Sequence, residues 1–331
     1  MKALVGAAAL AVIVGGAAAG PVAPDSETAL DQARRSAQAS SFSGVVDVVW
    51  RDGKVMRERQ LTVKAAGGVL LFGGPTPLMA LDQARLVHED AAWDVLWPAA
   101  LARLSRPDSG AKYEQRVSVG PKILGYDTII VDIRRGERVR ERLYVEQFFG
   151  LLLRREQFDD RGRIQRSVGF RELRIDAAAP PLPRPVSTAT RALRSVAVDE
   201  LHGAYSAPVV LGDGYRRTGA FRQGDVVQVV YSDGIYDLSV FEQRGRLGSK
   251  AAPRGGRPVR IAGAKGWHYT WPGGQLILWQ AGRTVYTVVA DAPYDDVVGA
   301  IRTVKGSSGP SVAYRFRQAC RSLVATFTDD R

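Results

Sequence analysis

The sequence predicts an α+β fold made of two antiparallel units joined by a linker. In residues 127–175, apolar and polar side chains alternate over short segments, which is typical of strands with one buried face. The Asp-Gly pairs at residues 52–53 and 233–234 separate further segments of this kind, and such pairs favour hairpin turns. A proline-rich stretch at 177–185 interrupts the pattern and divides the chain.

The strands expected between 127 and 175 cover residues 127–134, 138–146, 151–158 and 163–175. Within 138–146 one face carries Val139, Leu143 and Val145, and the other carries Arg138, Arg140, Arg142 and Tyr144. The first face is expected to pack on a core, and the second to meet solvent or a cavity. In 163–175 the apolar residues fall on even positions up to Phe170 and on odd positions at Leu173 and Ile175. That slip of parity predicts a β-bulge, or a strand that leaves its sheet.

The first domain is expected at 25–176 and the second, a smaller α+β domain, at 195–305. The first domain would add a helix at 26–39, a helix start near Pro98, and strands at 43–51, 55–64, 69–72 and 113–119. The second would begin with a short helix at 193–202 and end with a helix at 294–304. Its strands are expected at 215–222, 226–231, 236–243, 259–261, 265–271, 275–280 and 284–290. Residues 177–194 form the linker, and 306–331 form a basic tail that contains Cys320.

Residues 1–24 are predicted to be a signal peptide. Lys2 is followed by an apolar run from 3 to 19, and small residues precede Gly20 as a cleavage site requires. A retained N-terminal membrane anchor is the alternative. Either reading predicts an exported protein, periplasmic or associated with the cell envelope.

The net charge and the distribution of the arginines bear on which partners the protein could bind. The net charge is +12, with 38 Arg and 8 Lys, which reflects either arginine-rich codon usage or a surface that meets an anion. The arginines are interleaved with acidic residues rather than grouped, so a nucleic-acid partner is not expected.

No catalytic or metal-binding motif is present in the sequence. His88, His202 and His268 are not spaced as metal ligands, and the single Cys320 has no cysteine partner. The acidic pairs at 159–160 and 295–296 are expected to solvate a turn and to complement a helix N-terminus. A non-enzymatic protein without metal or cofactor is therefore predicted, and an envelope hydrolase is the less favoured hypothesis.

Large apolar residues of the first domain are the remaining candidates for a binding site. Either they form an ordinary core, or they line an apolar pocket between sheet and helices that would accept an acyl chain. The candidate lining residues are Trp50, Phe72, Trp93, Trp97, Leu143, Val145 and Phe170.

Several stretches together resemble the MucB/RseB family of periplasmic regulators of envelope-stress sigma factors. They are residues 113–125 (YEQRVSVGPKILG), 142–170 (RLYVEQFFGLLLRREQFDDRGRIQRSVGF), 211–215 (LGDGY) and 231–241 (YSDGIYDLSVF). The order of signal segment, helix, strand-rich domain, linker and smaller domain also matches. The family has longer helical and linker segments, and the basic tail has no counterpart in it.

The resemblance implies a first domain like the lipoprotein carriers LolA and LolB, with a strongly curved antiparallel half-barrel sheet and helices on its concave side. It further implies binding to a membrane-bound anti-sigma factor, a lipid-like or lipoprotein signal, and negative regulation of a stress sigma factor. A lipid or lipoprotein carrier of the cell envelope is the alternative, because a carrier would exchange ligand without an anti-sigma partner. Oligomeric state and partner-binding residues stay open at this stage.

Overall fold

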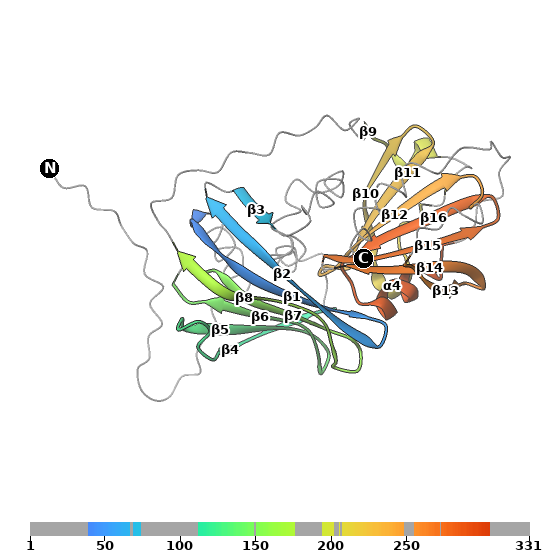
Figure 1. The fold of residues 1–331 in the computed structure, drawn as a ribbon. Helices are drawn as coiled ribbons and strands as arrows, with labels where there is room; N and C mark the ends of the chain where they lie inside the picture. Colours follow the sequence, from blue (N-terminus) through green and yellow to red (C-terminus); the bar gives the residue numbers. More distant parts are fainter. Residues whose placement is uncertain are drawn as a thin grey trace.

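The computed structural model describes residues 39–66, 69–73, 112–148, 150–175, 194–201, 205, 207–247, 255–271 and 273–304. These residues form two eight-stranded sheets, and every strand pair in them is antiparallel (Figure 1). The predominantly antiparallel architecture expected from the sequence is therefore confirmed.

The first sheet has the order β3-β2-β1-β8-β7-β6-β5-β4. Its strands are β1 (Phe42–Asp52), β2 (Val55–Ala66), β3 (Val69–Gly73), β4 (Glu114–Val119), β5 (Thr128–Arg135), β6 (Arg138–Glu146), β7 (Leu152–Phe158) and β8 (Ile164–Ile175). Because β1 pairs with β8, the first and last strands of this unit lie in the middle of the sheet. The two edges are β3 and β4.

Four register shifts interrupt the pairing in the first sheet, and two of them bear directly on the strand faces predicted from the sequence. On β8, Val46 pairs with Phe170 while Val45 pairs with Glu172, so Arg171 is an extra residue. This bulge lies where the slip of inward parity predicts one. On β6, Ile133 pairs with Glu141 while Arg134 pairs with Val139, so Arg140 is also an extra residue.

One face of the first sheet is apolar and buried. Val48 faces Val168 across β1 and β8, and Val131 faces Leu143 across β5 and β6; all four side chains are buried. The opposite face, with Arg142 for example, is partly exposed. The alternation in the sequence thus identifies the inner face correctly at Leu143 and Val145 of β6 and at Val168 and Phe170 of β8, but not at the bulge residue Arg140.

The second sheet has the order β13-β14-β15-β16-β12-β11-β10-β9. Its strands are β9 (Arg194–Ser195), β10 (Arg216–Gln223), β11 (Val226–Ser232), β12 (Asp237–Arg244), β13 (Arg257–Ile261), β14 (Ala264–Trp271), β15 (Gly274–Ala281) and β16 (Thr284–Ala290). The helix expected at 193–202 is wrong in extent. Residues 194–195 pair with β10 instead, and only the 3₁₀ turn η3 (Val198–Leu201) follows.

The closing helix α4 (Tyr294–Ile301) follows β16, with Pro293 at its N-cap. It packs against the 3₁₀ turn η4 (Gly212–Gly214) at two glycines. A Cβ on Gly212 would lie 2.4 Å from the carbonyl oxygen of Gly299, and a Cβ on Gly299 would lie 2.2 Å from a carboxylate oxygen of Asp213. At Gly212 only glycine permits this approach, because the clash is with backbone, whereas a side chain at Gly299 would require the Asp213 carboxylate to move.

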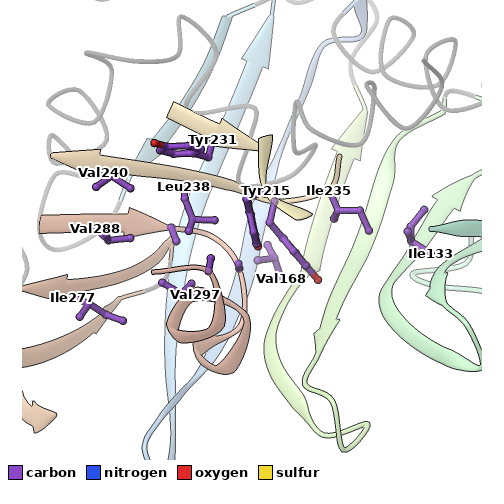
Figure 2. Close-up of a cluster of buried hydrophobic side chains, with 14 of the residues drawn as sticks. Ile133, Val168, Tyr215, Tyr231, Ile235, Leu238, Val240, Ile277, Val288 and Val297 are labelled. Carbon is purple, nitrogen blue, oxygen red and sulfur yellow. The ribbon is translucent and has the colours of Figure 1, made fainter. Parts of the chain in front are cut away.

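The main hydrophobic core is shared by the two units. Figure 2 shows Ile133 and Val168 of the first sheet in the same cluster as Tyr215 and Ile235 of the second part of the chain. Tyr215 and Ile235 have no solvent exposure. Burying an aliphatic side chain of this size contributes about 1.5–3 kcal/mol, so the shared core favours a fixed contact between the two sheets.

Several expected segments lie outside the described residues. They are the signal segment 1–24, the helix at 26–39 apart from residue 39, the helix start near Pro98, the linker 177–194 apart from its last residue, and the tail 306–331. The helices expected on the concave side of the first sheet are among them, so that part of the half-barrel architecture stays a prediction.

Candidate functional site

A cluster of polar groups, most of them buried, joins the two sheets, and we call it the junction. The first sheet and its flanking residues contribute Lys112, Tyr113, Arg140, Glu141, Arg155, Gln157, Asp160 and Arg166; the second part contributes Asp233, Tyr236, Gly273, Asp291 and Asp296.

Arg140 is the central residue of the junction. One guanidinium nitrogen donates to Asp160 in the β7–β8 turn, and another donates to Asp296 on α4. The Tyr236 hydroxyl donates to the backbone oxygen of Arg140 over 3.3 Å. The sequence pattern placed Arg140 on the outer face of β6, and that is wrong. As the extra residue of the bulge it breaks the strict alternation, and its side chain is buried.

The acidic residues around Arg140 lie where the sequence predicts them, and they have an additional role. Asp160 lies in the turn with its side chain 46% exposed and Asp296 lies at the helix start, and both bind the guanidinium group of Arg140. Burial raises the pKa of Asp296 to about 6, although the charge of Arg140 acts to lower it. The helix-start position of Asp296 is correct, but its side chain serves the contact between the sheets.

A second buried group surrounds Glu141. Arg155 donates two hydrogen bonds of 2.9 Å to its two carboxylate oxygens, in the bidentate geometry that gives strong charge-assisted pairs. Gln157 donates to Glu141 over 3.1 Å and to the backbone oxygen of Asp291 over 2.7 Å. Glu141 thereby links two strands of the first sheet and, through Gln157, the segment after β16.

Asp291 and Arg166 extend this group. Burial raises the pKa of the Asp291 carboxyl to about 7, and the carboxylate of Asp237 raises it further against the opposing effect of Arg155 and Arg166. Burial and the neighbouring Arg155 lower the pKa of Arg166 to about 10, so it stays charged at neutral pH. Arg166 donates to the backbone oxygen of Gly273 over 3.3 Å.

Asp233, in the YSDG sequence, connects a turn to the first sheet. One carboxylate oxygen accepts from the backbone N–H groups of Ile235 and Tyr236, at 3.1 and 2.9 Å, which fixes the turn. The other accepts from the Tyr113 hydroxyl at 2.7 Å and from the Lys112 ammonium. The hairpin motif that the sequence identified therefore also holds the two sheets together.

A third contact between the sheets involves His268. Arg257 forms an ion pair with Asp52 over 3.3 Å and donates to Nδ1 of His268 over 2.7 Å. Because that nitrogen accepts, Nε2 carries the proton and donates to Gln275 over 2.7 Å. Burial and the charge of Arg257 lower the pKa of His268 to about 4, so the ring is neutral at pH 7.

The candidate lining residues divide into two groups. Leu143, Val145 and Phe170 are buried in the main core, where the Phe170 ring packs edge-on against Phe42 with a centroid distance of 5.9 Å. Trp50 is partly buried against that core, and its buried indole nitrogen has no hydrogen-bond partner. The side chain of Phe72 and residues Trp93 and Trp97 lie outside the described residues. The pocket therefore remains a prediction.

Sequence reasoning missed the junction as a site. The signal available was a set of ionisable residues of both signs on neighbouring predicted strands, such as Glu141 and Arg155. Over the described ranges, no group of three or more His, Cys, Asp or Glu side chains is placed to hold a metal ion. In that same part of the chain, no helix has the length and apolar character needed to cross a membrane.

Comparison with known proteins gives structural matches alone. No family model and no curated protein sequence matches the chain. A crystal structure of MucB matches with 18% identity and a TM-score of 0.44, over 86% of this chain and 98% of the other. The chain is similar to MucB.

Two further structures extend the comparison with MucB. The complex of MucA and MucB from Pseudomonas aeruginosa matches with 16% identity and a TM-score of 0.44, over 88% of this chain and 100% of the other. A putative outer membrane lipoprotein-sorting protein domain from Vibrio parahaemolyticus matches with 10% identity and a TM-score of 0.19, over 46% of this chain and 92% of the other.

Proposed function

We propose that this protein is an extracytoplasmic, non-enzymatic regulator that binds the extracytoplasmic part of a membrane-bound anti-sigma factor. In doing so it keeps an envelope-stress sigma factor inactive. The MucB structures include one in complex with MucA, and a MucA-like protein is the partner proposed here.

The observation that carries the proposal is that residues of the four family-like stretches lie at, or directly beside, the contact between the two sheets. Tyr113, from the first, binds Asp233, from the fourth. Lys112, which precedes the first, donates to the backbone oxygen of Asp213, in the third, over 2.6 Å. The second stretch supplies Arg155 and Arg166. The parts of the sequence that resemble the family thus lie at the contact between the two sheets. This supports a protein whose two units bind the partner together.

The lipid-sensing part of the proposal depends on the inner face of the first sheet. Leu143, Val145 and Phe170 belong to the buried apolar core on that face, and Trp50 packs against this core. An acyl chain would gain about 0.8 kcal/mol for each buried CH₂ group. A lipid or lipoprotein carrier, the alternative function, would use the same apolar face. The two functions are distinguished by whether the protein binds an anti-sigma factor.

The test is purification of the full-length protein from its own membrane fraction, followed by native mass spectrometry and lipid extraction. We expect a single-span membrane protein to co-purify, and deletion of the gene to shorten the lifetime of that protein and raise transcription from the stress promoter. Stoichiometric lipid without any such protein would favour the carrier. Unchanged promoter activity in the deletion strain would contradict the regulatory function.

A further inference from the structure

Among the residues that the structure describes, β4 is an edge strand of the first sheet with no strand on its outer side. It pairs with β5 on one side through an uninterrupted register from Glu114–Arg134 to Val119–Ile129, and it is the last strand in the sheet order. Five of its six residues are exposed, and Gln115 is partly exposed. The side of β4 opposite β5 therefore offers main-chain groups for pairing.

The hydrogen-bond register identifies which main-chain groups are free. The N–H of Gly120 donates to the oxygen of Thr128 over 2.8 Å, so Gly120 and Thr128 are a hydrogen-bonded pair. In an antiparallel ladder such pairs alternate with non-hydrogen-bonded ones. Ser118 and Arg116 therefore bond to β5, whereas the N–H and C=O groups of Gln115, Val117 and Val119 point to the open edge.

The side chains along this edge also suit a further strand. Val117 and Val119 are 43% and 85% exposed. Val117 pairs with the buried Val131, so these two valines extend the apolar inner face of the sheet to its border. Arg116 and Ser118 lie on the opposite, polar face. A strand added beside β4 would continue the apolar inner face of the sheet. Its own inward-facing residues would therefore need to be apolar.

Edge strands usually carry features that block pairing, such as proline, lysine, a bulge or very short length. In the second sheet, β9 has two residues and β13 contains Pro258. In the first sheet, β4 contains no proline and no lysine, and its register with β5 has no shift. Its sequence therefore leaves an edge able to accept another strand.

We propose that β4 binds an extended segment of the partner protein as an additional antiparallel or parallel strand. The segment would alternate apolar residues, which lie beside Val117 and Val119, with polar residues on the outer face. This mode of recognition takes its affinity from main-chain hydrogen bonds and its specificity from alternate side chains. The inference rests on the proposed function, because it assigns the binding surface for the anti-sigma factor.

The test uses the purified extracytoplasmic segment of the single-span protein that co-purifies with the full-length chain. Val117→Pro removes an edge N–H without removing a hydrogen bond to β5, and Val117→Thr is the matched control that keeps this N–H. We expect Val117→Pro to weaken binding about tenfold or more, as the loss of one or more hydrogen bonds requires. Val117→Thr should change affinity by no more than about twofold.

Hydrogen exchange on the wild-type protein gives an independent measurement. The amides of Gln115, Val117 and Val119 should exchange rapidly in the free protein and slowly in the complex, whereas those of Arg116 and Ser118 should be slow in both. Full affinity of Val117→Pro, or unchanged exchange at the three edge amides, would overturn the β4 inference and leave the proposed function intact. Protection of the edge by a second copy of this chain would also overturn it. Failure of any single-span protein to co-purify would overturn both proposals.

Discussion

Arg140 and Asp296 form a buried ion pair between residues 156 positions apart in the chain, with side-chain exposures of 1% and 6%. The pair joins a bulge in the first sheet to the helix that closes the second. Desolvating two charges is costly, and Asp160 offsets part of this cost by accepting a second hydrogen bond from the guanidinium group. Removing one partner should therefore lower the free energy of unfolding by more than the net amount that the ion pair contributes to it.

Arg140→Met should lower the free energy of unfolding by about 3 kcal/mol or more at pH 7, because it leaves the carboxyl of Asp296 buried without a counter-charge. Urea unfolding followed by tryptophan fluorescence measures this. Arg138→Ala, on the same strand but exposed, is the control and should change stability by less than about 0.5 kcal/mol. Equal effects of the two substitutions would show that the ion pair does not hold the sheets together.

Asp291→Asn should change how stability depends on pH. Its pKa is about 7 in the folded protein against 3.8 unfolded, so the folded state binds more protons between these values. The contribution of this group is complete below about pH 4 and is lost as pH rises through 7, by roughly 1 kcal/mol per pH unit. Asparagine keeps the acceptor for the Asp237 N–H but does not ionise.

We therefore expect Asp291→Asn to be nearly neutral below about pH 4 and increasingly stabilising relative to wild type as the pH rises to 8, measured by urea unfolding at pH 4, 6 and 8. The difference between variant and wild type is the quantity to compare, since His268 contributes with the opposite sign. A difference that does not vary with pH would contradict the raised pKa.

Asp233 separates two roles that can be tested with two substitutions. Asp233→Asn keeps an oxygen for the N–H groups of Ile235 and Tyr236 but loses the charge that binds Lys112, so we expect a loss of about 1.5–3 kcal/mol. Asp233→Ala loses the turn contacts as well and should cost at least about 1 kcal/mol more. Urea unfolding measures both, and the Lys112→Met variant should reproduce only part of the first loss, because it keeps the hydrogen bond from the Tyr113 hydroxyl. Equal stabilities of the Asn and Ala variants would refute the role in the turn.

His268 should remain neutral, with its proton on Nε2, at pH 6. Its pKa is about 4, below the ordinary value of 6.5, because of burial and the charge of Arg257. A depressed histidine pKa favours the folded state above pH 6.5, and this contribution falls as pH drops towards 4. Imidazole ¹⁵N chemical shifts across a pH titration report both tautomer and pKa, and His268→Gln identifies the signal. Protonation with a midpoint near 6.5 would contradict the hydrogen bond from Arg257.

The alternation of residues allowed strands to be predicted over most of the described chain, and β6 and β16 have the predicted bounds. The slip after Phe170 marked a real bulge at Arg171. The equivalent irregularity at Arg140 left no such signal, because Val139, Leu143 and Val145 keep the same parity across it. An arginine is also compatible with the solvated face that the pattern assigned, so its burial could not be foreseen.

What the sequence determined by itself is local: strand periodicity, Asp-Gly turns and the faces that turn inward, all of which depend on residues within about ten positions of one another. The tertiary structure alone decided which charges are buried together. Arg140 with Asp296, and Tyr113 with Asp233, are paired by the packing of one sheet against another, and their separations in sequence leave no periodic pattern. Burial then changes the chemistry of these groups, since desolvation acts only once the two sheets have met.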